Sequence, residues 1–240
     1  MSGPPNTRRK HRAEITELLE SIGRALRRPV RVYILGGAAL TLRGIKDSTV
    51  DVDIIVEDQD SYNALAEALR SLGFYRESSL RFANPVTMDC VDVDVGKFIK
   101  LRLYEELREG SERLGVFGNL DALLLPNESI ILYKALTERE RDLDDIAAII
   151  RERRVNWDRL VRVAVVVTER ELESKRGEGV VLVYELLVTL ERINEKHPGL
   201  VPSNILSRLE KIADRYVKLW LRYARRHQEE SENEDRHVPA

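Results

Sequence analysis

The pattern of apolar and polar positions divides the chain near Pro126. Before it, short runs rich in β-branched residues alternate with segments whose apolar residues recur every three or four positions, which predicts strands and amphipathic helices in turn. The predicted strands are 30–35, 50–56, 88–95 and 120–125, with further strand around the loop at 84–85, and the predicted helices are 15–26, 38–42 and 61–72.

After Pro126 only the helical pattern remains, with predicted helices at 128–137, 143–151, 157–172, 179–195 and 203–226. The sequence therefore predicts an α/β lobe over 1–125, with a flexible basic tail at 1–10, and a helical lobe over 126–227. The last stretch, 228–240, is polar and acidic without an apolar face, so we expect it to be disordered.

Two acids lie on one face of the predicted strand 50–56. Alternate side chains of a strand share a face, so Asp51 and Asp53 point the same way and Val52 points the other. The following residues are apolar on both faces, which is typical of an inner strand of a sheet. At about 5 Å and an effective dielectric of about 20, two such carboxylates repel by roughly 3 kcal/mol. A divalent cation would remove that cost.

A second acidic strand follows at 88–95, where Asp92 and Asp94 share a face. If this strand lies beside the first, then Asp92, Asp94 or both complete a carboxylate triad with Asp51 and Asp53. Oxygen ligands on rigid strands suit Mg²⁺ or Mn²⁺, which keep positions open for water and phosphate.

Gly36 and Gly37 stand between a predicted strand and a predicted helix. Glycine allows backbone N–H groups to approach phosphate oxygens, and the start of a helix favours negative charge. A phosphate-binding turn facing a carboxylate site favours phosphoryl or nucleotidyl transfer. Taken alone, an Asp-X-Asp pair is usually a solvated strand face and Gly-Gly is usually a turn; their combination is the specific signal.

The composition limits the binding partners and the cellular location that the sequence favours. The 39 basic and 41 acidic residues nearly cancel, so bulk charge indicates neither a nucleic-acid coat nor a membrane surface. The single cysteine excludes an internal disulfide and favours a reducing, cytoplasmic location. No apolar run approaches the roughly 20 residues of a spanning helix, so no membrane partner is expected. The sequence also lacks the P-loop motif.

Gly36-Gly37, a gap of thirteen residues and Asp51-Val52-Asp53 resemble the signature of the polymerase-β-like nucleotidyltransferase superfamily. The resemblance covers roughly residues 30–150 and implies an α+β fold: a mixed sheet flanked by helices, followed by a helical C-terminal lobe. It also implies magnesium or manganese as cofactor and a nucleoside triphosphate, such as ATP, as substrate.

More narrowly, the chain resembles the branch related to AbiEii-type abortive-infection toxins, as a small archaeal-type member. Thr49 matches the residue two before the first acid, and Val91-Asp92 matches the third acid better than Asp94 does. The resemblance implies that Lys134 reaches the triphosphate. It further implies nucleotide-site roles for the charged segment that follows, at Arg139, Asp142 and Asp145; without it, that segment is equally well an ion-paired surface helix.

The chemistry that the resemblance implies is transfer of a nucleoside monophosphate to a hydroxyl of RNA, in particular tRNA, or of a protein, with a possible cognate antitoxin. Two alternatives stay open. One is an antibiotic-type enzyme that modifies a small molecule. The other is an inactive nucleotide-binding module with a regulatory or antitoxin-like role.

Overall fold

A computed structural model describes residues 8–137, 139–152, 155–174 and 179–235, with side chains up to residue 221. Its strands are β1 (Val30–Leu35), β2 (Val52–Val56), β3 (Tyr75–Arg76), β4 (Arg81–Asn84), β5 (Asp89–Val95), β6 (Lys97–Phe98), β7 (Leu101–Arg102), β8 (Glu112–Phe117) and β9 (Leu120–Leu124). Its helices are α1 (Arg12–Ala25), α2 (Gly36–Leu42), α3 (Gln59–Ser71), α4 (Glu105–Arg108), α5 (Asn127–Ala135), α6 (Glu140–Glu152), α7 (Trp157–Ser174), α8 (Leu182–Lys196) and α9 (Ser203–Asp235).

Seven of the described strands form one mixed sheet in the order β3-β4-β5-β2-β1-β9-β8. The pairs β1–β9 and β2–β5 are parallel, whereas the other neighbours in the sheet are antiparallel. β6 and β7 pair separately as a short hairpin. The predicted α+β class, with a mixed sheet flanked by helices and helices at the C-terminal side, is confirmed.

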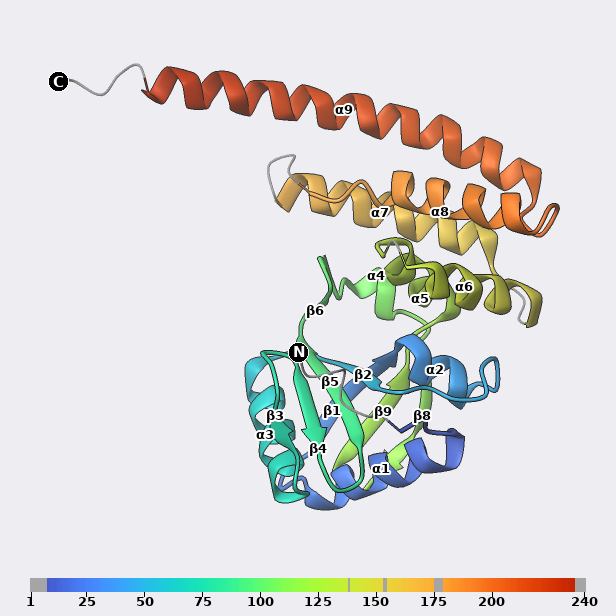
Figure 1. Cartoon of the computed structure of the whole chain (residues 1–240). Coiled ribbons are helices and arrows are strands. Elements are labelled where there is room, and N and C mark those ends of the chain that lie inside the picture. The colour runs from blue at the N-terminus through green and yellow to red at the C-terminus, as the bar shows by residue number, and fades with distance from the viewer. Residues whose placement is uncertain (1–7, 138, 153–154, 175–178, 236–240) are drawn as a thin grey trace, which may run out of the picture.

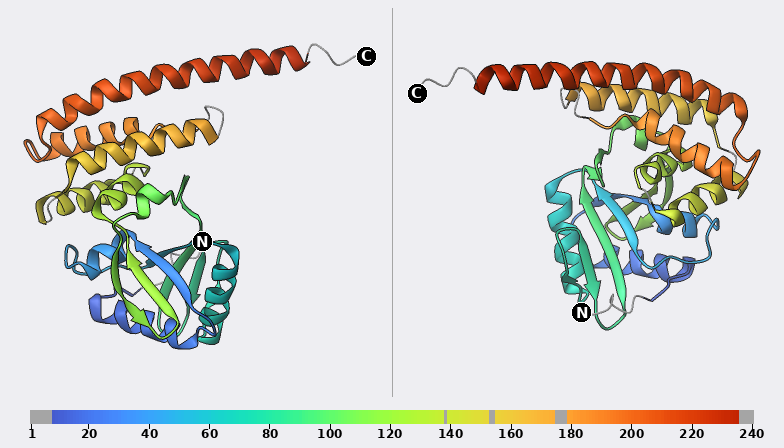
Figure 2. Two further views of the ribbon diagram at one scale, coloured as in Figure 1. Left: turned by 180° about the vertical axis from the view of Figure 1, so that it is seen from behind. Right: turned by 45° about the horizontal axis from the view of Figure 1, so that its top comes forward.

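The helices lie in layers around this sheet (Figure 1). α1 and α3 pack against each other and against the sheet. α5 to α9 stack in successive layers beyond one end of the sheet, and α9 lies outermost in every view (Figures 1 and 2). Among the described residues, none of these helices combines the length and apolar character needed to span a bilayer.

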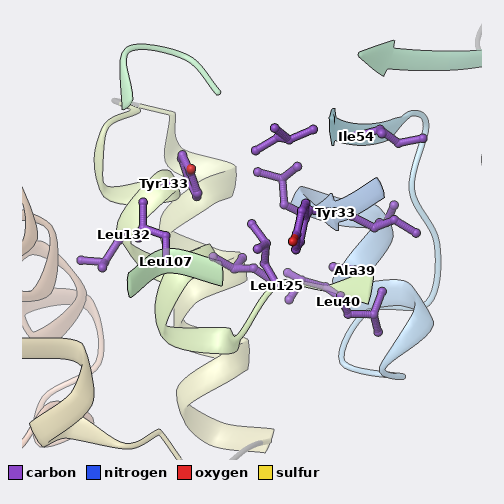
Figure 3. Close-up of a cluster of buried hydrophobic side chains, with 14 of the residues drawn as sticks. Tyr33, Ala39, Leu40, Ile54, Leu107, Leu125, Leu132 and Tyr133 are labelled. Atoms are coloured by element: carbon purple, nitrogen blue, oxygen red, sulfur yellow. The ribbon is translucent and has the colours of Figure 1, made fainter. Parts of the chain in front are cut away.

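One apolar core joins the sheet to the first of the stacked helices. Figure 3 shows side chains of the sheet and α2 in the same cluster as Leu107 of α4 and Leu132 and Tyr133 of α5, with Leu125 between them. Tyr133 is 1% exposed, and its ring packs edge-on against Phe98 with centroids 5.7 Å apart. Because this contact is continuous, the start of the helical region is fixed relative to the sheet.

Two expectations about the chain ends need correction. The basic tail was expected to be flexible through residue 10, but Lys10 is 1% exposed and pairs with Thr49 through two backbone hydrogen bonds of 2.7 and 3.0 Å. At the other end α9 continues to Asp235, through most of the segment expected to be disordered. Glu and Gln are good helix formers, so a helix already started can extend without an apolar face. Residues 1–7 and 236–240 lie outside the described residues.

Candidate active site

The two acidic strands lie side by side at the centre of the sheet. β2 and β5 are parallel neighbours, and Asp53 pairs in register with Asp92. Asp51 immediately precedes β2. The expected meeting of Asp51, Asp53 and Asp92 is therefore what the sheet topology produces.

Arg81 completes this group from the neighbouring strand β4, where it pairs in register with Asp92. Its Nε and Nη2 donate to the two carboxylate oxygens of Asp92 at 2.8 and 2.7 Å, and Nη2 also donates to Asp51 at 3.1 Å. These four side chains, Asp51, Asp53, Asp92 and Arg81, are called the carboxylate cluster below.

Asp53 is the acid in this cluster without a hydrogen bond from Arg81. Burial, then the negative charges of Asp51 and Asp92, raise its pKa from 3.8 to about 8, against the opposing charges of Lys134 and Arg81. Asp53 therefore holds a proton at neutral pH in the absence of a cation. A cation placed beside the three acids would offset both causes and lower this pKa.

Positions 36 and 37 require glycine, because a Cβ atom at either one would collide with a neighbouring side chain, Asp53 or Thr49. A Cβ on Gly36 would lie 2.1 Å from Oδ2 of Asp53, and Gly36 also has a φ of +61°. A Cβ on Gly37 would lie 2.5 Å from Oγ1 of Thr49. Leu35 pairs in register with Asp53 across β1 and β2, which sets this close approach. The spacing of the motif thus encodes a turn packed directly against the carboxylate cluster.

A second charged group faces this one from the helical side. Lys134 on α5 donates to Asp142 at 2.5 Å and to Asp145 at 2.8 Å, both on α6, and Lys46 donates to Asp145 at 2.8 Å. Thr137 also donates to Asp142, at 2.5 Å. Lys134, Asp142 and Asp145 are each less than a tenth exposed. We call Lys46, Lys134, Asp142 and Asp145 the lysine cluster; its two positive and two negative charges balance.

Both clusters line one cavity of about 520 Å³, within the range of small-molecule sites. All of the residues predicted from the sequence line it: Gly36, Gly37, Thr49, Asp51, Asp53, Asp92, Asp94, Lys134, Arg139, Asp142 and Asp145. Phe98, Ile99, Ile130 and Tyr133 supply an apolar part of the wall.

Asp94 shares the cavity but has different contacts. It is 5% exposed, and its Oδ1 accepts from the backbone N–H of Val95 at 3.0 Å. Burial raises its pKa, yet neither Asp51 nor Asp53 is among the causes of that shift. Of the two acids between which the sequence left the third position open, Asp92 is the one that joins Asp51 and Asp53.

Four cations of the cavity were missed as site residues: Arg9, Lys46, Arg81 and Arg141. Arg81 could have been found by pairing the two strands around the turn at 84–89, which places residue 81 opposite residue 92. Lys46 joins Asp145 across 99 positions, a contact for which the sequence carries no signal. Arg9 reaches the cavity because the paired backbone at Lys10 fixes the preceding residue, and it donates to Ser48 at 3.2 Å.

As the side chains stand, no three acidic, histidine or cysteine residues in the described part of the chain are arranged to hold a metal ion. Arg81, a cation, instead bridges two of the three acids. The donor set still fits Mg²⁺ or Mn²⁺, because three carboxylates meet in or beside rigid strands and Asp53 has no hydrogen bond from Arg81.

The family model described as "Nucleotidyltransferase of unknown function (DUF6036)" matches residues 12–191, which include both clusters. The chain belongs to this family. It is thus a nucleotidyltransferase, as the glycine turn and the acidic strands predict. The search of curated proteins and the search of solved structures gave no match.

Proposed function

We propose that this nucleotidyltransferase transfers a nucleoside monophosphate from a nucleoside triphosphate to a hydroxyl group of RNA, with tRNA the first candidate. The observation that carries the proposal is the in-register pair of Asp53 and Asp92, joined by Asp51, in a cavity that also contains the glycine turn. The toxin-like role implied by the resemblance to the AbiEii-type branch is part of the same proposal.

Asp51, Asp53 and Asp92 are the residues that would hold Mg²⁺ or Mn²⁺. When bound, such an ion activates a hydroxyl nucleophile and offsets charge on the triphosphate. A cation beside Asp53 would offset the burial, and then the repulsion from Asp51 and Asp92, that raise its pKa, so that Asp53 would contribute a full negative charge. Asp94, buried in the same cavity, stays outside this set.

The phosphates are assigned to the part of the cavity beside the carboxylate cluster, where Gly36 and Gly37 begin α2. Glycine at these two positions lets the backbone pack against Asp53 and Thr49, which brings the start of α2 next to the three acids. Lys134 adds a positive charge that already acts on Asp53. Asp142 and Asp145 fix the position of its ammonium group, so Lys134 needs no reorganisation when a triphosphate enters.

In the transfer step, the acceptor oxygen forms a bond to the α-phosphorus and the bond from that phosphorus to the bridging oxygen breaks. Pyrophosphate leaves, and the hydroxyl proton passes to a carboxylate, for which we propose Asp92. Arg139 and Arg141 are exposed cations at the cavity, and Arg9 lies there as well. Cations beside the reacting centre favour an acceptor with a phosphate backbone over a neutral one.

The test is incubation of the purified protein with each α-labelled nucleoside triphosphate, Mg²⁺ or Mn²⁺, and either total tRNA or a cell extract. Label on RNA that is lost in Asp51→Ala supports the proposal. Label on a polypeptide or on a small molecule would replace RNA as the acceptor. No labelled product under any of these conditions would leave the regulatory module as the better description.

A further inference from the structure

Arg81 supplies the positive charge that contacts two acids of the carboxylate cluster, Asp51 and Asp92. Its guanidinium binds both oxygens of Asp92 and one oxygen of Asp51, with nitrogen–oxygen distances of 2.7 to 3.1 Å. The planar fork of arginine matches a carboxylate in this two-pronged way, which a lysine cannot do. Arg81 therefore competes for the oxygens that would bind a divalent cation.

The position of Arg81 also allows its side chain to move away from Asp51 and Asp92. It lies at the start of β4, directly after Ser78, Ser79 and Leu80, and its side chain is 32% exposed. Asp51 and Asp92 are less exposed, at 23% and 21%. The two acids are fixed in or beside central strands, so the long arginine side chain is the partner that can move. The cavity that it lines also contains Gly36, Gly37 and Lys134.

We propose that Arg81 is a built-in competitor of the metal ion: it neutralises Asp51 and Asp92 in the free protein and turns to the triphosphate when the metal-nucleotide complex enters. The inference rests on the proposed function, since it uses the same three acids as metal ligands. Its consequence is an order of binding. The free ion binds weakly, and the ion that arrives with a nucleotide binds well because the phosphates give the released guanidinium a new partner.

The experiment measures Mn²⁺ affinity by electron paramagnetic resonance, without nucleotide and with a nucleotide analogue that cannot be cleaved at the α-phosphorus. Four proteins are compared: wild type, Arg81→Ala, Arg81→Lys and Arg113→Ala. Arg113 pairs with Asp121 on the exposed face of β8 and β9, so its removal reports the general effect of losing one positive charge.

The expected result is a reversal between the two conditions. Without nucleotide, Arg81→Ala binds Mn²⁺ about tenfold more tightly than wild type, because the competing charge is gone. With the analogue, the same variant binds Mn²⁺ more weakly than wild type, because no guanidinium contacts the phosphates. Arg81→Lys keeps the charge without the fork and lies between, while Arg113→Ala follows wild type in both conditions.

Equal or weaker Mn²⁺ binding by Arg81→Ala without nucleotide would overturn the proposal, because a purely structural arginine gives that outcome. If the tightening is present but persists with the analogue, the transfer of Arg81 to the phosphates is wrong. The metal site itself is tested separately by Asp53→Asn in the Arg81→Ala background. If Asp53→Asn leaves Mn²⁺ binding unchanged, Asp53 is not a metal ligand, and the site on which the proposed function depends is wrong. If Asp53→Asn abolishes Mn²⁺ binding but Arg81→Ala binds Mn²⁺ no more tightly than wild type, only the inference about Arg81 is overturned.

Discussion

The lysine cluster and the carboxylate cluster form two charged walls of the cavity, and they differ in how far their negative charges are neutralised. In the lysine cluster, Lys134 and Lys46 meet Asp142 and Asp145, so each buried charge has an opposite neighbour. In the carboxylate cluster, three acids share one arginine, and Asp53 is left without a hydrogen bond from it. The first wall is complete as it stands, while the second lacks positive charge.

We expect the two clusters to have different roles: the lysine cluster stabilises the fold around the cavity, and the carboxylate cluster takes part in the reaction. A balanced buried group holds its members in place, and here it fixes the ammonium group of Lys134 at the cavity wall. In the unbalanced group, burial and then the charges of Asp51 and Asp92 raise the pKa of Asp53 to about 8, and the group gains free energy when a cation enters. Changes to the carboxylate cluster should therefore affect activity most, and changes to the lysine cluster should affect stability most.

The largest effect is expected from Asp53→Asn. The amide keeps the shape of the side chain but cannot become the anion that a divalent ion requires, so nucleotidyl transfer should fall by at least about 10³-fold. Release of labelled pyrophosphate measures it. The fold should persist, because the amide has nearly the shape of the protonated carboxyl group that the raised pKa of Asp53 favours in the folded protein. An unfolded variant, or one with near-normal turnover, would contradict the assignment of Asp53.

Lys134→Met should give the opposite profile in the lysine cluster, with stability lost first. It removes the ion pairs that Asp142 and Asp145 both make with Lys134, while Lys46 still pairs with Asp145. Removing one partner of a buried ion pair costs about 3–5 kcal/mol of unfolding free energy. Denaturant unfolding measures the loss. Lys46→Ala is the matched control: its side chain is 33% exposed, so its removal should cost about 1 kcal/mol or less. Equal losses of unfolding free energy in Lys134→Met and Lys46→Ala would show that the buried ion pairs of Lys134 do not stabilise the fold more than the partly exposed one of Lys46.

Much of this site could be predicted from the chain because it depends on local periodicity. Alternation along two strands places Asp53 and Asp92 on defined faces, and Gly36-Gly37 marks the turn that must pass close to them. The same rules could not supply the sheet order that makes β2 and β5 neighbours. That order comes from packing between segments far apart in sequence; β8, at the edge beside β9, was not predicted at all, since Gly115 interrupts its pattern.

The partners of the charges were also beyond the sequence. Lys134, Asp142 and Asp145 lie within twelve positions and were grouped by their motif, but Lys46 comes from a loop nearly a hundred residues away. Lys10 was assigned to a loose tail because its burial depends on Thr49 and on Val50, whose carbonyl accepts from its Nζ at 2.9 Å. Composition predicts that such charges need partners but not which ones they find.

Gly36→Ala tests whether the turn and the carboxylate cluster are packed as tightly as the geometry indicates. The new methyl group would meet Oδ2 of Asp53 at 2.1 Å, so the carboxylate or the turn must shift. Gly44→Ala is the control, because Gly44 has a similar φ of +71° but open space around it. Gly36→Ala should cost about 1–3 kcal/mol more than the control and lower activity by at least about tenfold. Matching losses in the two variants would refute the close contact.

The prediction that isolates the missing charge concerns the pH dependence of stability without metal. Asp53 has a pKa of about 8 when folded against an ordinary 3.8. Between these values the unfolded chain has lost a proton that the folded chain retains, so rising pH favours unfolding, by at most about 1.4 kcal/mol per pH unit. Asp53→Asn lacks this term. The free energy of unfolding of the variant minus that of wild type, measured with a chelator present, should therefore grow from pH 5 to pH 8 and then level off. A difference that stays constant across this range would mean that Asp53 is already ionised beside Arg81, and that the carboxylate cluster is as balanced as the lysine cluster opposite it.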